Sequence, residues 1–275
     1  METPCTLLQQ RLKSIHQGLG KLERELKKAK QIGTSSQFAK VSSLLKTILD
    51  KKEQLMSAYR EQVGEILQPW FASEDFKEIS KKEVLIHESG EVEISFAGNL
   101  IIERPSIPTI VTSLVGVSNN ALFSRVNLSR VESVKVQYIF LDCYLPSYIS
   151  THLKYIECDT MRVGNNSTPG YRNCGDVYFL SLQRIKGKLV IPMNSAVQHF
   201  YAPRLRECDN MDVKSAKNVR CSSLQTVYDG IETGVEVTSF RQAFPVLTDF
   251  NPARFHVYST EATKEMYNIY EKQSR

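Results

Sequence analysis

The sequence predicts an α+β protein in which an N-terminal antiparallel, coiled-coil-like helical hairpin precedes a short irregular β-solenoid and a C-terminal capping helix. Three observations support this fold class. Apolar residues recur with heptad spacing over residues 1–70. β-branched residues in short alternating stretches begin at residue 84. Further on, the nine-residue segments YIECDTMRV (155–163) and LRECDNMDV (205–213) nearly repeat each other, which is typical of a repeat fold.

Two long amphipathic helices are expected before residue 70. In residues 6–30 the apolar positions follow alternating steps of four and three, which define an a/d seam. Residues 38–67 follow the same spacing, with Lys52 and Gln62 at two of the seam positions. The linker between them, QIGTSSQ, is short. Because a short linker between long amphipathic helices favours antiparallel packing, we expect an αα-hairpin. Its second helix should end near Gln68, before Pro69.

The seams of this hairpin are a candidate interface. They can pack on each other, on the rest of the chain or on a second copy, and the sequence leaves these alternatives open. The candidate interface residues are Leu12, Leu19, Leu22, Leu26, Leu45, Ile48 and Leu55. Residues 1–70 hold 12 Lys and Arg against 7 Asp and Glu, so the whole net charge of +5 lies there. Cations alternate with Glu, however, which is typical of a solvated helix face and argues against a nucleic-acid partner.

Residues 84–258 are expected to form the β-rich part. The first of them, 84–103, read as two or three strands with Gly90 and Gly98 at turns. Pairs of apolar or Cys residues three positions apart then recur every 19–27 residues. These anchors are Val131/Val134, Tyr155/Cys158, Leu182/Ile185, Leu205/Cys208, Leu224/Val227 and Leu247/Phe250. Each unit should supply one strand and one return turn, so that stacked units bury a continuous core.

The anchors resemble those of the leucine-rich-repeat superfamily. The segments LQRIKGKLVI (182–191) and LRECDNMDV (205–213) carry the resemblance, which covers residues 125–250. It implies an irregular leucine-rich-repeat-like solenoid that presents one β-face to a partner. A β-sandwich is the alternative fold for short strands at such spacing.

The repeated Glu-Cys-Asp triplet indicates a candidate binding face. Successive strand residues face opposite sides, so the acids should point away from core-facing Cys158 and Cys208, which we expect to share one repeat position. Stacked units would then present an acidic ladder with arginines beside it. The candidate face consists of Glu157, Asp159, Arg162, Arg184, Glu207 and Asp209. Such a ladder is either a solvated surface or part of a polar binding face, with a catalytic carboxylate pair as the least favoured reading.

Residues 259–275 are expected to form a helix over the last repeat. Ser259 or Thr260 can cap it, and Met266, Ile269 and Tyr270 lie on one face. A terminal helix of this kind shields the open edge of a solenoid.

The remaining motifs limit the function classes. The sequence has no phosphate-binding loop, nucleophile elbow or metal-ligand spacing, so no cofactor or metal is expected. Cysteines that read as reduced, together with the lack of a signal peptide or transmembrane segment, predict a cytoplasmic protein.

The sequence therefore predicts a non-enzymatic module that binds a protein partner. The alternative is a structural or assembly protein, as in a viral or phage complex, that forms homo-oligomers through the hairpin. A second alternative is a degenerate enzyme or regulatory enzyme subunit that pairs Cys158 or Cys208 with His199.

Overall fold

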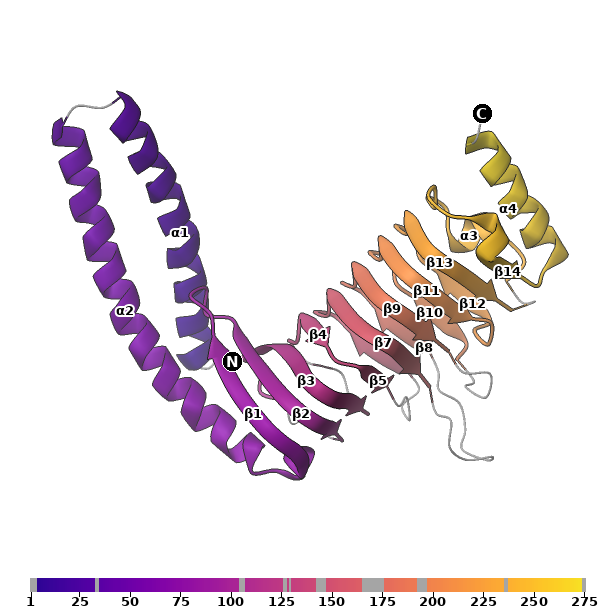
Figure 1. Ribbon diagram of the computed structural model, residues 1–275, viewed down its shortest axis with the longest axis horizontal. Coiled ribbons are helices and arrows are strands. Elements are labelled where there is room, and N and C mark those ends of the chain that lie inside the picture. The colour runs from indigo at the N-terminus through magenta and orange to yellow at the C-terminus, as the bar shows by residue number, and fades with distance from the viewer. Residues whose placement is uncertain are drawn as a thin grey trace.

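The computed structural model confirms the predicted fold class. N-terminal helices lead into a β-solenoid of about six turns, and a C-terminal helix follows (Figure 1). The structure describes residues 4–32, 35–103, 107–125, 128, 130–141, 147–164, 176–191, 197–234 and 237–273. No helix in these ranges is long and apolar enough to cross a lipid bilayer.

Helices α1 (Pro4–Ile32) and α2 (Ser35–Phe71) lie side by side and antiparallel (Figure 1). Their base packs on the first strands: Leu12 and Tyr59 are fully buried, and the Tyr59 hydroxyl donates to the carbonyl oxygen of Gly90 at 2.9 Å. Beyond Leu19 in α1 and before Lys52 in α2, no described side chain is buried. The base of the hairpin therefore belongs to the core, while its tip projects from it.

The end of α2 differs from the prediction by three residues, because Pro69 lies inside the helix and Phe71 ends it. A proline this close to a C-terminus removes one hydrogen bond and leaves the rest of the helix intact. Packing stabilises the extra turn. Trp70 is buried, donates from Nε1 to Asp75 Oδ2 at 2.9 Å and meets the ring of Phe76 edge-on at 4.7 Å.

Two sheets form the solenoid. The long sheet contains β1 (Glu78–Ile86), β2 (Val92–Ile102), β3 (Val111–Ser124), β4 (Ser133–Lys135), β5 (Tyr138–Leu141), β7 (Tyr155–Val163), β9 (Arg184–Val190), β11 (Glu207–Val213), β13 (Thr226–Thr233) and β14 (Phe255–Val257). The short sheet contains β6 (Ser147–Ser150), β8 (Asp176–Phe179), β10 (His199–Tyr201) and β12 (Asn218–Arg220). Only β1 and β2 pair antiparallel among the described strands. The return path of several turns thus carries a strand of its own, where the sequence predicted only a turn.

The N-terminal strands correct two expectations. β1 begins at Glu78, whereas the sequence predicted a start at residue 84. The prediction missed the first residues of the strand because this edge strand exposes both faces and therefore lacks the expected alternation. Gly90 lies in the turn between β1 and β2, as predicted. Gly98 does not lie at a turn. It lies inside β2 with φ +109°, beside a register shift where the Glu78 carbonyl comes close.

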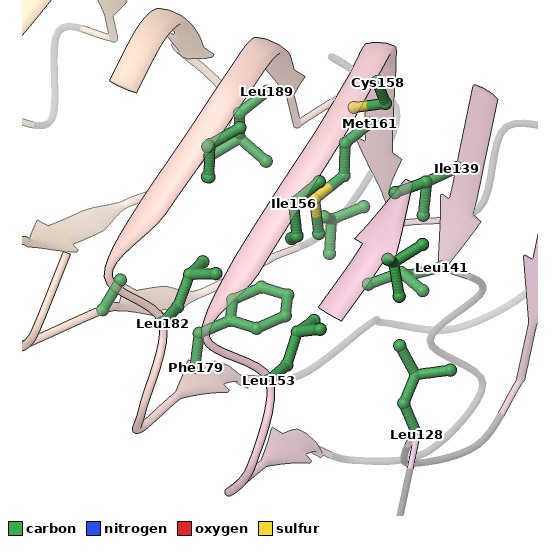
Figure 2. Close-up of a cluster of buried hydrophobic side chains, with 14 of the residues drawn as sticks. Leu128, Ile139, Leu141, Leu153, Ile156, Cys158, Met161, Phe179, Leu182 and Leu189 are labelled. Atoms are coloured by element: carbon green, nitrogen blue, oxygen red, sulfur yellow. The ribbon is translucent and has the colours of Figure 1, made fainter. Parts of the chain in front are cut away.

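The core lies between the two sheets, where side chains of successive turns stack (Figure 2). Five of the six predicted anchor pairs are buried. The pair Tyr155/Cys158 is wrong, because Tyr155 is exposed and the buried anchor of that turn is Leu153/Ile156. In the register, Ile156 stacks between Val134 and Ile185.

Helix α4 (Thr260–Gln273) covers the last turn, as predicted, together with the short helix α3 (Phe240–Ala243) (Figure 1). Ala262 and Met266 of α4 are buried. Between these elements lie 3₁₀ helix η2 (Pro252–Arg254) and a cluster of rings from Phe240, Phe250 and Phe255, whose centroids are 4.9–6.0 Å apart. η1 (Glu74–Phe76) occupies the opposite end, after α2.

Candidate functional site

The six predicted face residues lie on three neighbouring strands of the long sheet. Glu157, Asp159 and Arg162 belong to β7, Arg184 to β9, and Glu207 and Asp209 to β11. None of the six side chains is buried. β7 pairs with β9, and β9 with β11, so these residues do form one surface.

The surface is a ladder of paired charges and not an acidic one. Glu157 lies 3.4 Å from Lys135 Nζ and 3.0 Å from Lys186 Nζ, one on each neighbouring strand. The hydrogen bond from Lys186 holds the pKa of Glu157 below its usual range. Arg184 Nε lies 3.3 Å from Glu207 in the same way. The sequence could not show this pairing, because each partner comes from a different turn.

Asp209 has a structural role in this surface. Its Oδ2 accepts a hydrogen bond from the backbone N–H of Gly187 at 2.9 Å. Gly187 lies in β9 with φ +116°, a conformation that glycine adopts readily. The Asp209 carboxylate therefore satisfies a backbone donor at an irregular point of the sheet.

The two Glu-Cys-Asp triplets do not occupy equivalent positions. The parallel register pairs Ile156 with Ile185 and Ile185 with Cys208. Cys208 is thus equivalent to Ile156, and not to Cys158. The prediction that both cysteines share one repeat position is wrong.

β-bulges of different length explain the mismatch. The next shared level of the core is formed by Met161, Leu189 and Met211. The previous level is formed by Ile156, Ile185 and Cys208. Between the two levels there are four residues in β7, three in β9 and two in β11. The ends of the two similar segments therefore align, whereas their beginnings are offset by two residues.

The cysteines are not placed for nucleophilic chemistry with His199. Cys158 and Cys208 are buried in the long sheet. His199 is exposed on the short sheet, where its Nε2 lies 4.0 Å from Asp176. Burial, with Asp159 and Asp209 nearby, raises the pKa of Cys158 to about 12, so the thiol stays protonated at neutral pH.

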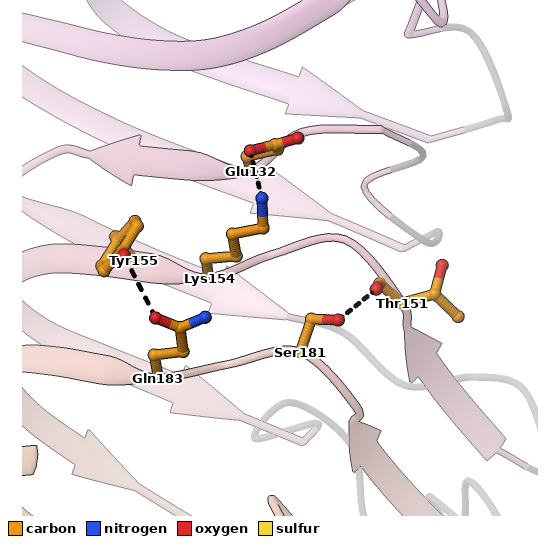
Figure 3. Close-up of polar contacts among 6 residues, drawn as sticks. All are labelled: Glu132, Thr151, Lys154, Tyr155, Ser181 and Gln183. Atoms are coloured by element: carbon orange, nitrogen blue, oxygen red, sulfur yellow. Dashed lines mark hydrogen bonds and ion pairs between the residues drawn. The ribbon is translucent and has the colours of Figure 1, made fainter. Parts of the chain in front are cut away.

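Exposed tyrosines mark the same face of the long sheet. Tyr155 and Tyr228 are 49% and 51% exposed, and Tyr138 on β5 is also exposed. The Tyr155 hydroxyl donates to Gln183 Oε1 at 3.1 Å (Figure 3). Sequence reasoning missed Tyr138, and it missed Tyr155 by treating it as an anchor. The apolar pair Leu153/Ile156, two residues earlier, is the signal in the sequence from which Tyr155 could have been predicted as a surface residue.

Neighbouring turns are also joined by polar contacts beside this face. Lys154 Nζ lies 2.6 Å from Glu132 Oε2, and the Ser181 hydroxyl donates to the carbonyl oxygen of Thr151 at 2.6 Å (Figure 3). Since each contact joins two neighbouring turns, these bonds help to maintain the register that positions the surface residues.

The candidate hairpin residues divide into two groups. Leu12 and Leu19 are buried within the chain and have no surface to offer a partner. The others are half-buried: Leu22, Leu26, Leu45, Ile48 and Leu55. The most exposed leucines of α2 were not predicted, namely Leu44 and Leu49, which are 50% and 46% exposed.

The fold defines a parallel β-solenoid with helical ends, an architecture typical of non-enzymatic repeat proteins. Across the described ranges, no group of three or more His, Cys, Asp or Glu side chains is arranged to hold a metal ion. Comparison of the chain with models of protein families, with curated proteins and with solved structures found no match.

Proposed function

We propose that this protein is a non-enzymatic interaction module that binds a protein partner on the long sheet. The binding surface is the outward face of this sheet, opposite the core, which we call the open face. The observation that carries this proposal is the set of exposed tyrosines, Tyr138, Tyr155 and Tyr228, on a ladder of paired charges. Tyrosine is enriched at protein interfaces because it adds a large contact area and a hydroxyl at low entropic cost. The paired charges around these rings can set the orientation of a partner.

Two further features support the wider assignment. Buried anchors three residues apart, with one parallel strand of the long sheet in each turn, favour an irregular leucine-rich-repeat-like solenoid. The described cysteines, Cys5, Cys158, Cys208 and Cys221, are buried free thiols. Free thiols are typical of reducing compartments, which supports a cytoplasmic location.

A pair of matched variants tests the binding face. The face variant changes Tyr155 and Tyr228 to Ala, and the control changes Tyr258 and Tyr267, which are comparably exposed near the C-terminal end. Partners are captured with each full-length protein and quantified by mass spectrometry, and Kd is then measured with the purified partner. We expect the face variant to weaken binding at least about tenfold and the control less than about twofold. Equal retention of every partner by both variants would refute the proposal.

Assembly through the hairpin tip is the second candidate function, and the exposure of Leu44 and Leu49 favours it. These leucines flank the half-buried seam of α2 and widen its apolar face. Light scattering coupled to size exclusion should show a multiple of the 31.3 kDa chain mass. Changing both leucines to Asp should restore the monomer, whereas Leu180→Asp on the solenoid should not. A wild-type protein that is monomeric at high concentration excludes this function.

A further inference from the structure

A second surface, separate from the open face of the long sheet, contains a pocket. It lies on the short sheet near its C-terminal edge, between β10 and β12 on one side and the segment 237–243 on the other. Its volume is about 360 Å³. Sites for small ligands usually occupy about 300–1,000 Å³, so the volume of this pocket lies within the range of small-molecule sites.

The floor of the pocket follows from the register of the short sheet. Tyr178, Tyr201 and Arg220 are direct neighbours across β8, β10 and β12. His199 and Asn218 form the next row, two residues earlier on their strands. Because successive strand residues alternate between faces, both rows point outward, while Phe200 and Val219 between them are buried.

The charge of the pocket is positive. Lys217 and Arg220 line it, and neither contacts a carboxylate in the described part of the chain. No Asp or Glu is found among the described lining residues. This differs from the long sheet, where Glu157 lies within 3.4 Å of two lysines.

Two carboxylates, Asp176 and Glu265, contact residues of the lining, and each already has a donor. Asp176 accepts a hydrogen bond from the Tyr178 hydroxyl at 2.8 Å and faces His199 at 4.0 Å. Glu265 accepts from the Ser239 hydroxyl at 3.0 Å and from the backbone N–H of Arg241 at 3.1 Å. Among these contacts, neither carboxylate pairs with Lys217 or Arg220.

Planar and amide groups complete the lining. The rings of Tyr178 and Tyr201 lie 6.0 Å apart at 71°, so a flat group can stack on one ring while it meets the edge of the other. The side-chain amides of Asn218 and Gln242 line the pocket and make no hydrogen bond to another described residue. An amide of this kind can donate to and accept from the edge of a heterocycle.

We infer that this pocket binds a small phosphorylated compound with a planar heterocyclic ring, the chemical class of the nucleoside monophosphates. Arg220 and Lys217 would bind the phosphate, for which the planar guanidinium offers a bidentate fork. Tyr178 and Tyr201 would stack with the ring, and Asn218 and Gln242 would contact its edge. The pocket is separate from the tyrosines of the open face, so it adds a ligand to the proposed function without depending on it.

Four classes of probe separate the parts of this ligand. Isothermal titration of the full-length protein is carried out with AMP, GMP, CMP and UMP, with adenosine, with ribose 5-phosphate, and with inorganic phosphate. We expect at least one nucleotide to bind at least about tenfold tighter than adenosine, which lacks the phosphate. The same nucleotide should bind at least about tenfold tighter than ribose 5-phosphate and inorganic phosphate, which lack the ring.

Matched variants place the binding in the pocket. Changing Lys217 and Arg220 together to Gln should weaken the best nucleotide at least about tenfold. The control changes Arg204 and Lys264, two exposed cations outside the pocket, and should leave Kd unchanged within about twofold. Circular dichroism verifies the fold of each variant, and Tyr201→Leu provides an independent test of stacking.

Three outcomes overturn the inference. The first is that no nucleotide binds at millimolar concentration. The second is that inorganic phosphate binds as tightly as the best nucleotide, since the rings would then contribute nothing. The third is that the control pair of cations weakens binding as much as the pocket pair does.

Discussion

Gly187 tests the irregular register on which the account of the open face depends. An added Cβ at this position would lie 1.7 Å from the carbonyl oxygen of Cys158 and 2.8 Å from its carbonyl carbon. Both atoms are backbone, so no side chain can rotate away to relieve the contact. In addition, φ is +116°, a value that L residues rarely adopt. Gly187→Ala therefore combines backbone strain with a clash between two paired strands.

The expected loss of stability can be worked from these two terms. A residue held in a sparsely populated backbone region costs about 1–3 kcal/mol. Relieving the clash requires β7 and β9 to separate locally, which breaks one or two ladder hydrogen bonds at about 0.5–1.5 kcal/mol each. Together these terms lower the free energy of unfolding by about 1.5–6 kcal/mol, with a midpoint of about 4 kcal/mol, which is large for one substitution. For a chain of this size, this corresponds to a fall in Tm of about 10 °C.

Urea and thermal unfolding followed by circular dichroism measure this loss. Gly18→Ala is the matched control, because Gly18 lies in α1 and an added Cβ there has no neighbour within 4 Å. In a helix, Ala is favoured over Gly by about 1 kcal/mol, so the control should be neutral or stabilising. If Gly187→Ala unfolds within about 1 kcal/mol of the wild type, the close approach of β9 to Cys158 is wrong, and so is the register of the face.

Three further predictions concern the groups around this face. Asp209→Ala should lower the free energy of unfolding by about 1–3 kcal/mol in urea titrations, because it leaves a backbone donor without its charged acceptor; an unchanged midpoint contradicts this role. The Lys214–Glu232 pair (2.8 Å) lowers the pKa of the acid and raises that of the amine. Its contribution, up to about 1 kcal/mol, is lost as the pH falls below about 4.5 and again as it rises beyond about 10.5. Lys214→Met should therefore match the wild type at both extremes and be less stable between them; a pH-independent difference excludes the pair. Cys158 and Cys208 should react with a maleimide only after unfolding, as mass spectrometry can show; rapid labelling of the native protein would contradict their burial.

The architecture could be predicted from the sequence because it depends on periodic apolar patterns. The heptad seams predicted both helices of the hairpin, and the anchors predicted the stacked turns. Both signals report which residues are buried, and burial dominates folding. The end of α2 could not be predicted, because the burial of Trp70 outweighs the cost of a proline in the last turn. The strands of the short sheet were also missed, because each has only three or four residues and shows too few alternations.

The repeated triplet shows why internal similarity is weaker evidence than burial. In a parallel solenoid the register is set by the side chains that stack in the core, here Ile156, Ile185 and Cys208. Bulges change the number of residues between two such levels without moving the levels themselves. A sequence alignment that admits no gap must therefore match Cys208 to Cys158, whereas the structure matches it to Ile156.

Charge pairing distinguishes the two surfaces of the solenoid in a way that composition cannot. Cations and carboxylates that pair between neighbouring turns are far apart in the chain, by 18 residues for Lys214 and Glu232 and by 29 for Lys186 and Glu157, so the sequence does not show that they meet. On the long sheet such pairs leave little net charge to attract an ion, so the recognition that we propose there depends on exposed tyrosines. In the pocket of the short sheet, Lys217 and Arg220 have no carboxylate partner among the described residues, so an anion can gain their full interaction. This difference is the reason why we propose different ligands for the two surfaces, a protein for the first and a small phosphorylated compound for the second.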